Sequence, residues 1–129
     1  MSGTVIIVED NAMNMKLLDQ ALSIAGYRTL KSSDGDGLVE MAAGGADVVL
    51  MDIQLPKRSG VDLLKELRED PRTRAMPVLA VTAFADPESV NGFLSEGFNQ
   101  VITKPISVRK LLEEVEQYCN KDRLIPPGQ

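Results

Sequence analysis

Short runs that favour strands alternate with stretches of helical periodicity along the whole chain. Five runs predict strands, and they are Thr4–Val8, Tyr27–Lys31, Asp47–Met51, Pro77–Val81 and Gln100–Thr103. The first, third and fourth are typical of strands buried on both faces. The second is half polar, which suits the edge of a sheet. After each run, apolar residues recur three or four positions apart, which predicts a helix.

Capping residues indicate where several of the helices begin. Asp34 is expected to cap the second helix and Ser107 the last. The stretch Asp86-Pro87-Glu88 combines an N-cap, a proline in the first turn and an early acid at the start of the fourth helix. Gly92 then lies inside that helix, where glycine costs about 1 kcal/mol relative to alanine. We therefore expect the fourth helix to be the loosest.

Five strand–helix units in succession predict an α/β fold. Such alternation implies a parallel sheet with right-handed crossovers and helices on both faces. Near this length we expect a doubly wound, flavodoxin-like (βα)5 arrangement, with five strands in the order 2-1-3-4-5. The 129 residues suit one domain, which we expect to span residues 1–119, followed by a flexible tail at 120–129.

The composition excludes several classes of function. Hydrophobic residues make up 43% of the chain, so a globular core is feasible. The net charge of −5, without a cluster of lysine and arginine on one element, disfavours nucleic-acid binding. The absence of histidine and the single cysteine, Cys119, remove histidine-based catalysis, intramolecular disulfides and cysteine metal clusters. No apolar run approaches membrane-spanning length, so we expect a soluble cytoplasmic protein without membrane insertion.

Chemically active side chains stand at the ends of four predicted strands. Glu9 and Asp10 follow the first strand, and Asp52 follows the third. Thr82 ends the fourth strand and Lys104 follows the fifth. These strands are neighbours in the predicted order, so their ends line up along the carboxyl edge, where open α/β sheets place their ligands. Crowded carboxylates repel one another, and a lysine with a divalent cation such as Mg²⁺ would offset that repulsion.

Each of these residues also has an ordinary structural interpretation. Asp52 could make a turn or cap the next helix, and Glu9 and Asp10 could favour the positive end of the first helix. Lys104 could be a solvated charge, and Thr82 a strand-end residue. These alternatives stay open for each residue by itself, but the shared position at one edge favours a functional site.

Four motifs, in order, resemble the receiver domain of bacterial two-component response regulators over about residues 4–119. They are Glu9-Asp10, Met51-Asp52-Ile53-Gln54-Leu55-Pro56 with Gly60, Val81-Thr82-Ala83, and Lys104-Pro105. Each motif by itself is weakly specific, whereas all four at strand ends are strongly so.

The resemblance implies a role for each site residue. Asp52 would accept a phosphoryl group from the phosphohistidine of a histidine kinase. Asp10, Asp52 and the backbone carbonyl of Gln54 would hold Mg²⁺, with Glu9 acting through a water molecule. Thr82 and Ala83 would bind the phosphoryl group and Lys104 would pair with it. The Lys104–Pro105 peptide bond would be cis.

Within the family, the chain most resembles single-domain regulators of cell division. The likeness implies a sensor histidine kinase or a histidine phosphotransfer protein as phosphodonor, and a role in cell-cycle or cell-fate control. It implies that a downstream protein binds the face formed by the fourth helix, fifth strand and fifth helix. No enzyme activity is expected beyond the domain's own phosphorylation and dephosphorylation. Because the chain ends soon after the last helix, no DNA-binding domain is expected.

Position 101 departs from the family pattern. Receivers usually carry tyrosine or phenylalanine three residues before the lysine, and that ring reorients on activation. This chain has Val101 instead. Since valine cannot reproduce the ring movement, we expect the fourth helix and the loop before it to carry more of the switch.

Three other functions fit parts of the pattern. A flavin-binding electron carrier has the same fold, but Glu9-Asp10 would repel the flavin phosphate and the chain has no tryptophan. A phosphohydrolase with an aspartate nucleophile usually needs a second acid two residues later, where this chain has Gln54. A receiver that acts as a phosphorylation-independent interaction module is the main alternative. The complete set of acids, Thr82 and Lys104 argue against it.

Overall fold

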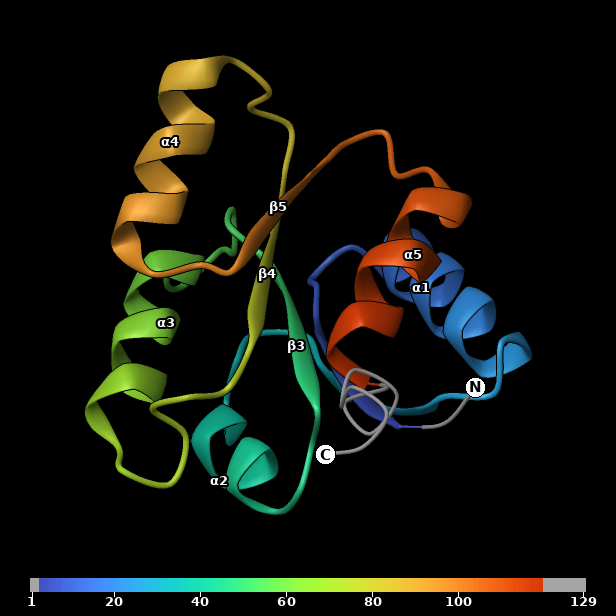
Figure 1. Cartoon of the computed structure of the whole chain (residues 1–129), viewed down its shortest axis with the longest axis horizontal. Coiled ribbons are helices and arrows are strands. Elements are labelled where there is room, and N and C mark those ends of the chain that lie inside the picture. The colour runs from blue at the N-terminus through green and yellow to red at the C-terminus, as the bar shows by residue number, and fades with distance from the viewer. Residues whose placement is uncertain (1–2, 120–129) are drawn as a thin grey trace, which may run out of the picture.

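The computed structural model describes residues 3–119, which form one parallel sheet with helices on both faces (Figure 1). The strands lie in the order β2-β1-β3-β4-β5, so the predicted fold class and strand order are confirmed. The elements are β1 (Thr4–Val8), α1 (Ala12–Ile24), β2 (Arg28–Ser32), α2 (Leu38–Ala43), β3 (Val48–Asp52), α3 (Gly60–Glu69), β4 (Val78–Thr82), α4 (Pro87–Glu96), β5 (Gln100–Thr103) and α5 (Val108–Cys119). The predicted tail, 120–129, lies outside the described residues.

Alternation along the central strands produces two cores, one on each face of the sheet. Side chains of a strand point to opposite faces in turn, so Ile6 and Val49 face α2 and α3, whereas Val5 and Leu50 face α1 and α5. Figure 1 shows the same division, with α2, α3 and α4 on one side of the sheet and α1 and α5 on the other. Strands β3 and β4 are buried along their whole length, as expected for strands covered on both faces.

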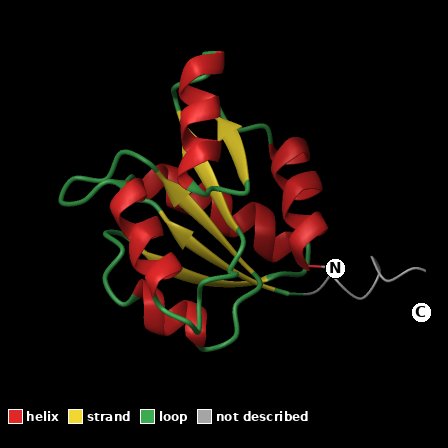
Figure 2. Ribbon diagram, turned by 60° about the vertical axis from the view of Figure 1, so that its left-hand side comes forward, coloured by secondary structure: helices red, strands yellow, loops and turns green. Residues whose placement is uncertain are grey.

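The strand ends bring the candidate residues to one edge of the sheet. Strands β3 and β4 end one residue later than predicted, at Asp52 and Thr82. Both strands also begin one residue later than predicted, at Val48 and Val78. The carboxylate of Asp47, just before β3, accepts a hydrogen bond from the backbone N–H of Thr4 at 2.8 Å. Figure 2 shows the strands running side by side through the molecule between the two helical layers.

The start of α2 differs from the prediction. Asp34 does not cap this helix, because its Oδ1 accepts a hydrogen bond from the N–H of Asp36 at 2.9 Å. The N-cap is Gly37, with φ of 75° and no side-chain capping bond. Gly35, at φ of 88°, adopts the same left-handed region, which glycine enters without steric cost. The two glycines form a turn that delays the helix beyond the reach of Asp34.

Helix α4 is the most loosely packed of the helices in the described part of the chain. It begins as predicted, because the Asp86 carboxylate accepts a hydrogen bond from Ser89 N–H at 2.9 Å and Pro87 lies in the first turn. None of its side chains is buried, whereas each of the other described helices has at least two buried residues. In Figure 1, α4 extends above the rest of the molecule. Over residues 3–119, no helix combines the length and the apolar character that crossing a bilayer requires.

Candidate functional site

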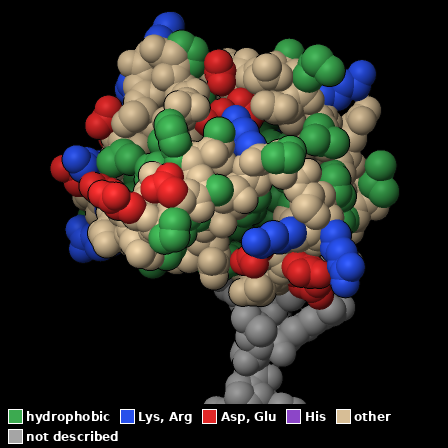
Figure 3. Space-filling model, turned by 90° about the horizontal axis from the view of Figure 1, so that it is seen from above, with side chains coloured by type: hydrophobic (Ala, Val, Ile, Leu, Met, Phe, Trp, Pro, Cys, Tyr) green, Lys and Arg blue, Asp and Glu red, His purple; other side chains and the backbone are tan. Residues whose placement is uncertain are grey.

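The carboxyl edge of the sheet gathers the acidic and basic residues that the sequence singled out. Glu9 and Asp10 follow β1, Asp52 ends β3 and Lys104 follows β5. Because β1 pairs with β3 and β4 pairs with both β3 and β5, their ends lie close together. Figure 3 looks onto this face and shows acidic and basic side chains in contact near its centre, among hydrophobic ones.

Three carboxylates form a compact cluster. Glu9, Asp10 and Asp52 each offer an oxygen within 4.8 Å of the others. Glu9 is 2% exposed and Asp52 is 3% exposed, whereas Asp10 faces solvent. Glu9 Oε2 accepts a hydrogen bond from Asn11 N–H at 3.2 Å, but the buried Oε1 has no hydrogen-bond partner among the described residues. A buried carboxylate oxygen without a hydrogen bond is costly, so this cluster is suited to a cation.

Asp52 is held at both oxygens. Its Oδ1 accepts a hydrogen bond from the backbone N–H of Gln54 at 2.8 Å, and its Oδ2 accepts one from Lys104 Nζ at 3.1 Å. Asp52 therefore makes a turn, but it does not cap α3, whose N-cap is Ser59. A turn-forming role for Asp52 thus accounts for the hydrogen bond at Oδ1, but it does not account for the pairing of Oδ2 with Lys104.

The acidic pair does not cap α1 either. The N-cap is Asn11, whose side chain accepts a hydrogen bond from Asn14 N–H at 2.9 Å. Asn11 thus has two roles, because its own N–H binds Glu9. Asn11 was not predicted as a cap, although an asparagine directly before a helical pattern is an ordinary capping signal.

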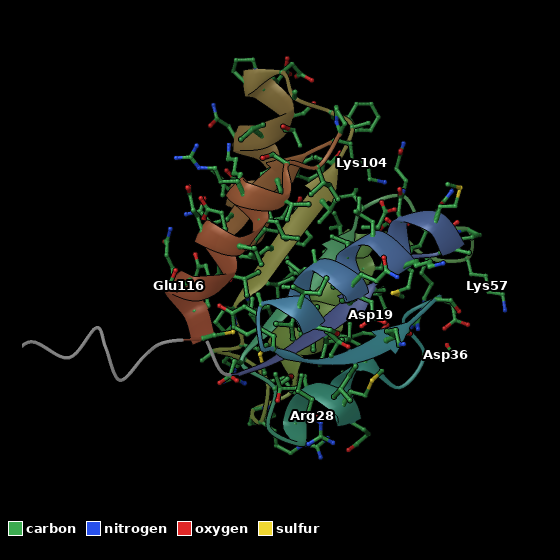
Figure 4. The ribbon with its side chains drawn as sticks, turned by 90° about the vertical axis from the view of Figure 1, so that its right-hand side faces the viewer. Asp19, Arg28, Asp36, Lys57, Lys104 and Glu116 are labelled. Atoms are coloured by element: carbon green, nitrogen blue, oxygen red, sulfur yellow. The ribbon has the colours of Figure 1, made fainter. Side chains whose placement is uncertain are left out.

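Lys104 reaches the cluster from the end of β5, which is an edge strand of the sheet. Figure 4 labels it where β5 passes into α5. Besides its bond to Asp52, Nζ lies 3.7 Å from Glu9 Oε1. Its backbone N–H donates to the Thr82 carbonyl at 2.7 Å, and the Lys104–Pro105 peptide bond is cis, the isomer that the resemblance implied. Lys104 is thus not a freely solvated charge, since its side chain is 25% exposed and paired.

The electrostatics of the cluster shift two pKa values in the same direction. Burial, and then the hydrogen bond and charge of Asp52, raise the pKa of the Glu9 carboxyl to about 7 from its usual 4.5. For Lys104, burial alone would lower the pKa, but the hydrogen bond to Asp52 and the charges of Asp52, Glu9 and Asp10 outweigh it and raise the pKa. Both shifts report an excess of negative charge at a site shielded from water.

The remaining predicted residues lie around the cluster. Thr82 is 1% exposed, and its Oγ1 accepts a hydrogen bond from Phe84 N–H at 3.0 Å. Ala83 follows it at an exposed bend, and the Gln54 side chain is exposed. Val101 is half-buried on β5 and packs against the core shared by α2 and α3, so no aromatic ring occupies that position.

Gly60 shapes the site in a way that the sequence analysis did not identify. A Cβ at this position would lie 2.8 Å from the Asp52 carbonyl oxygen, so only glycine allows the start of α3 to approach the end of β3. Gly60 N–H also donates to the Ile53 carbonyl at 2.9 Å. The sequence signal was the glycine that closes the turn after Pro56, but the close approach depends on tertiary packing.

Comparisons with known proteins agree with this geometry. The model of the response regulator receiver domain family matches residues 5–116. The polar-differentiation response regulator DivK of Brucella ovis is 40% identical over 119 residues, which cover 92% of this chain and 97% of that protein.

Solved structures of receiver-type proteins are also similar to this chain. The receiver domain of the sensor histidine kinase PA1611 of Pseudomonas aeruginosa, whose structure has magnesium coordinated in the active-site cleft, is 28% identical, with a TM-score of 0.81 over 92% of this chain and 98% of that one. The chemotaxis protein CheY4 of Vibrio cholerae, at 23% identity, shares the fold with a TM-score of 0.82 over 92% of this chain and 99% of its own. The chain belongs to the response regulator receiver domain family, and within that family it is similar to DivK.

Proposed function

We propose that Asp52 accepts a phosphoryl group from the phosphohistidine of a sensor histidine kinase or a histidine phosphotransfer protein. The single observation that carries the proposal is the buried Asp52 carboxylate, paired with Lys104 at 3.1 Å and clustered with Glu9 and Asp10. An Asp52 oxygen attacks phosphorus, the phosphorus–nitrogen bond to the donor histidine breaks, and the imidazole keeps the electron pair and takes up a proton. The product is an aspartyl phosphate.

The acidic cluster fits a divalent cation. Mg²⁺ prefers oxygen ligands and keeps several waters, and here Asp10 and Asp52 would hold it with the backbone carbonyl of Gln54, while Glu9 would act through a water molecule. Glu9 Oε1 supports this assignment, because it is buried without a hydrogen bond and its nearest cation, Lys104 Nζ, is 3.7 Å away. A bound Mg²⁺ would supply positive charge beside the transferring phosphoryl oxygens, the main contribution that a protein site makes to such transfers.

This chain's own residues would orient and neutralise the phosphoryl group. Lys104 would provide a second positive charge. The Thr82 hydroxyl and the backbone N–H of Ala83 would donate hydrogen bonds to the phosphoryl oxygens. Movement of Thr82 would release its bond to Phe84 N–H. That bond lies at the start of the loop into α4, so the loop and α4 would report the phosphorylation.

The domain would transmit its signal by binding another protein, not by catalysing a reaction on a substrate. A downstream partner would bind the face formed by α4, β5 and α5 when Asp52 is phosphorylated, and the domain would catalyse only its own phosphorylation and dephosphorylation. The likeness to DivK, named as a polar-differentiation regulator, supports a role in cell-cycle or cell-fate control in the cytoplasm.

Intact-mass measurement tests the acceptor. The protein is incubated with a small phosphodonor and Mg²⁺, and wild type is compared with Asp52→Asn and with the control Asp62→Asn, which changes an exposed aspartate on α3. We expect one phosphoryl adduct on wild type and the control, none on Asp52→Asn, and loss of the adduct with a chelator. An unmodified wild type, with small donors and with histidine kinases, would leave the phosphorylation-independent interaction module.

Hydrogen exchange tests the response. Phosphorylation is expected to change the amide protection of residues 82–98, which contain the loop after β4 and helix α4. Protection that is the same with and without the adduct throughout this segment would contradict the proposed switch while leaving the phosphorylation itself intact.

A further inference from the structure

A groove between α3 and α4 lies apart from the acidic cluster around Asp52. Its volume is about 410 Å³. Val61 and Phe93 contribute apolar surface, whereas Asp86, Glu88 and Glu96 bring carboxylates, and Gly92 contributes no side chain. Figure 1 shows α4 standing above α3 on the same side of the sheet. The residues that line the groove run along α4 from Asp86 to Glu96.

Gly92 keeps this groove open without any structural need for glycine. Its backbone is helical rather than left-handed, and a Cβ added there would meet nothing within 4 Å. Glycine is destabilising in the interior of a helix. The chain therefore carries a local cost at Gly92, and the space that a side chain would fill is the groove.

One acidic residue of the groove, Glu96, is also placed at a local cost. Glu96 is the last residue of α4, and the last turn has no basic residue, so its charge opposes the helix dipole. Over residues 3–119, none of Asp86, Glu88 and Glu96 is in an ion pair. Hydrogen bonding to Ser89 lowers the pKa of Asp86, so that carboxylate stays charged at neutral pH.

We propose that the α3–α4 groove binds a segment of a partner protein that places one apolar side chain between basic residues. The apolar side chain would lie against Val61 and Phe93 in the space beside Gly92, and lysine or arginine on each side would pair with Glu88 and Glu96. Unfavourable local choices that share one surface are typical of functional sites. The groove lies on the α3 side of α4, and its occupation does not require phosphorylation of Asp52.

A defined peptide tests the proposal by amide chemical shifts of the whole chain. The probe is a short end-capped peptide with a leucine between two pairs of lysines, added in the presence of Mg²⁺ so that the cluster at Asp52 does not attract it. We expect shifts centred on Val61, Gly92 and Phe93. A peptide with serine in place of the leucine should bind at least about tenfold more weakly, because the apolar anchor is lost.

Two substitutions of the same glycine separate groove filling from helix stability. Gly92→Ala and Gly92→Leu both favour the helix, but only leucine fills the groove. We expect Gly92→Ala to bind the peptide within about twofold of wild type and Gly92→Leu to bind at least about tenfold more weakly. Asp52→Asn should bind as wild type does. Amide shifts outside α4 that match wild type would show that Gly92→Leu is folded.

Several results would overturn the proposal. These are shifts centred on Glu9 and Asp10, equal binding of the serine peptide, unchanged binding by Gly92→Leu, or no shifts at millimolar peptide. If the sedimentation coefficient of the wild type rose with protein concentration and that of Gly92→Leu did not, the groove would be assigned to a second copy of this chain instead.

Discussion

The carboxyl edge around Asp52 and the helix α4 lie near each other but are held in opposite ways. Glu9, Asp52 and Thr82 are each at most 3% exposed, and each accepts a hydrogen bond from a backbone N–H. Helix α4 has no buried side chain and carries a glycine in its interior. A group that must position a transferring phosphoryl needs a fixed geometry, whereas an element that responds must be cheap to move. The edge that would hold the phosphoryl group is buried and fixed by backbone hydrogen bonds, whereas the helix that we expect to respond is loosely packed.

A matched pair of leucine truncations measures this difference most directly. Leu79 is completely buried on β4, whereas Leu94 on α4 is 41% exposed. We expect Leu79→Ala to lower the free energy of unfolding by about 3 kcal/mol, because it leaves a cavity in the core. Leu94→Ala should change it by less than about 0.5 kcal/mol. Urea unfolding measures both, and a similar loss for the two variants would show that α4 is packed as firmly as the sheet.

The tight packing of the carboxyl edge should make stability depend on pH. The pKa of Glu9 is raised from 4.5 to about 7 by burial and by Asp52, so the folded state binds a proton more tightly than the unfolded state. Its stabilising contribution is present below pH 4.5 and is lost as the pH rises through about 7. Without Mg²⁺, we expect the free energy of unfolding to fall by on the order of 2–3 kcal/mol across that window.

Two variants and one ion sharpen the pH prediction. Glu9→Gln should remove most of the fall, whereas Glu69→Gln, at the exposed end of α3, should leave it in place. Mg²⁺ should raise the melting temperature more at pH values above 7 than near 5, because the ion favours the charged carboxylates. A slope that survives in Glu9→Gln would place its origin elsewhere.

Alanine at two glycine positions, Gly60 and Gly92, should change the free energy of unfolding in opposite directions. Gly60→Ala should destabilise the protein by roughly 2 kcal/mol, since its Cβ would lie 2.8 Å from the Asp52 carbonyl oxygen. It should also slow phosphorylation, because the turn that carries Gln54 would shift. Gly92→Ala should stabilise by about 1 kcal/mol and leave phosphorylation unchanged. Thermal unfolding and adduct formation followed by mass report both, and destabilisation by Gly92→Ala would contradict the open groove.

The sequence predicted the edge of the sheet well because its signals are local. Apolar runs that stop at Glu9, Asp52 and Lys104 place these residues at strand ends, and the strand order then brings the ends together. The prediction for Asp34 was wrong because Gly35 and Gly37 form a turn before the helix. The two Asp-Gly pairs there are an ordinary turn signal, which the capping prediction did not use. Contacts that depend on tertiary packing could not be predicted from local sequence signals. The approach of Gly60 to β3 and the groove between Val61 and Gly92 depend on how α3 and α4 settle on the sheet.

The smallest effects lie within α4 itself, where two glutamates face opposite ends of the same dipole. Glu88 lies in the first turn and Glu96 at the last residue. We expect Glu88→Gln to destabilise and Glu96→Gln to stabilise, each by about 0.3–0.5 kcal/mol at low ionic strength. Both variants remove one negative charge from a chain of net charge −5, so general relief of repulsion cancels in their difference. Added salt should shrink that difference. If the two variants changed the free energy of unfolding with the same sign and size, the position of Glu96 would carry no cost, and the charge of the groove would need no partner to explain it.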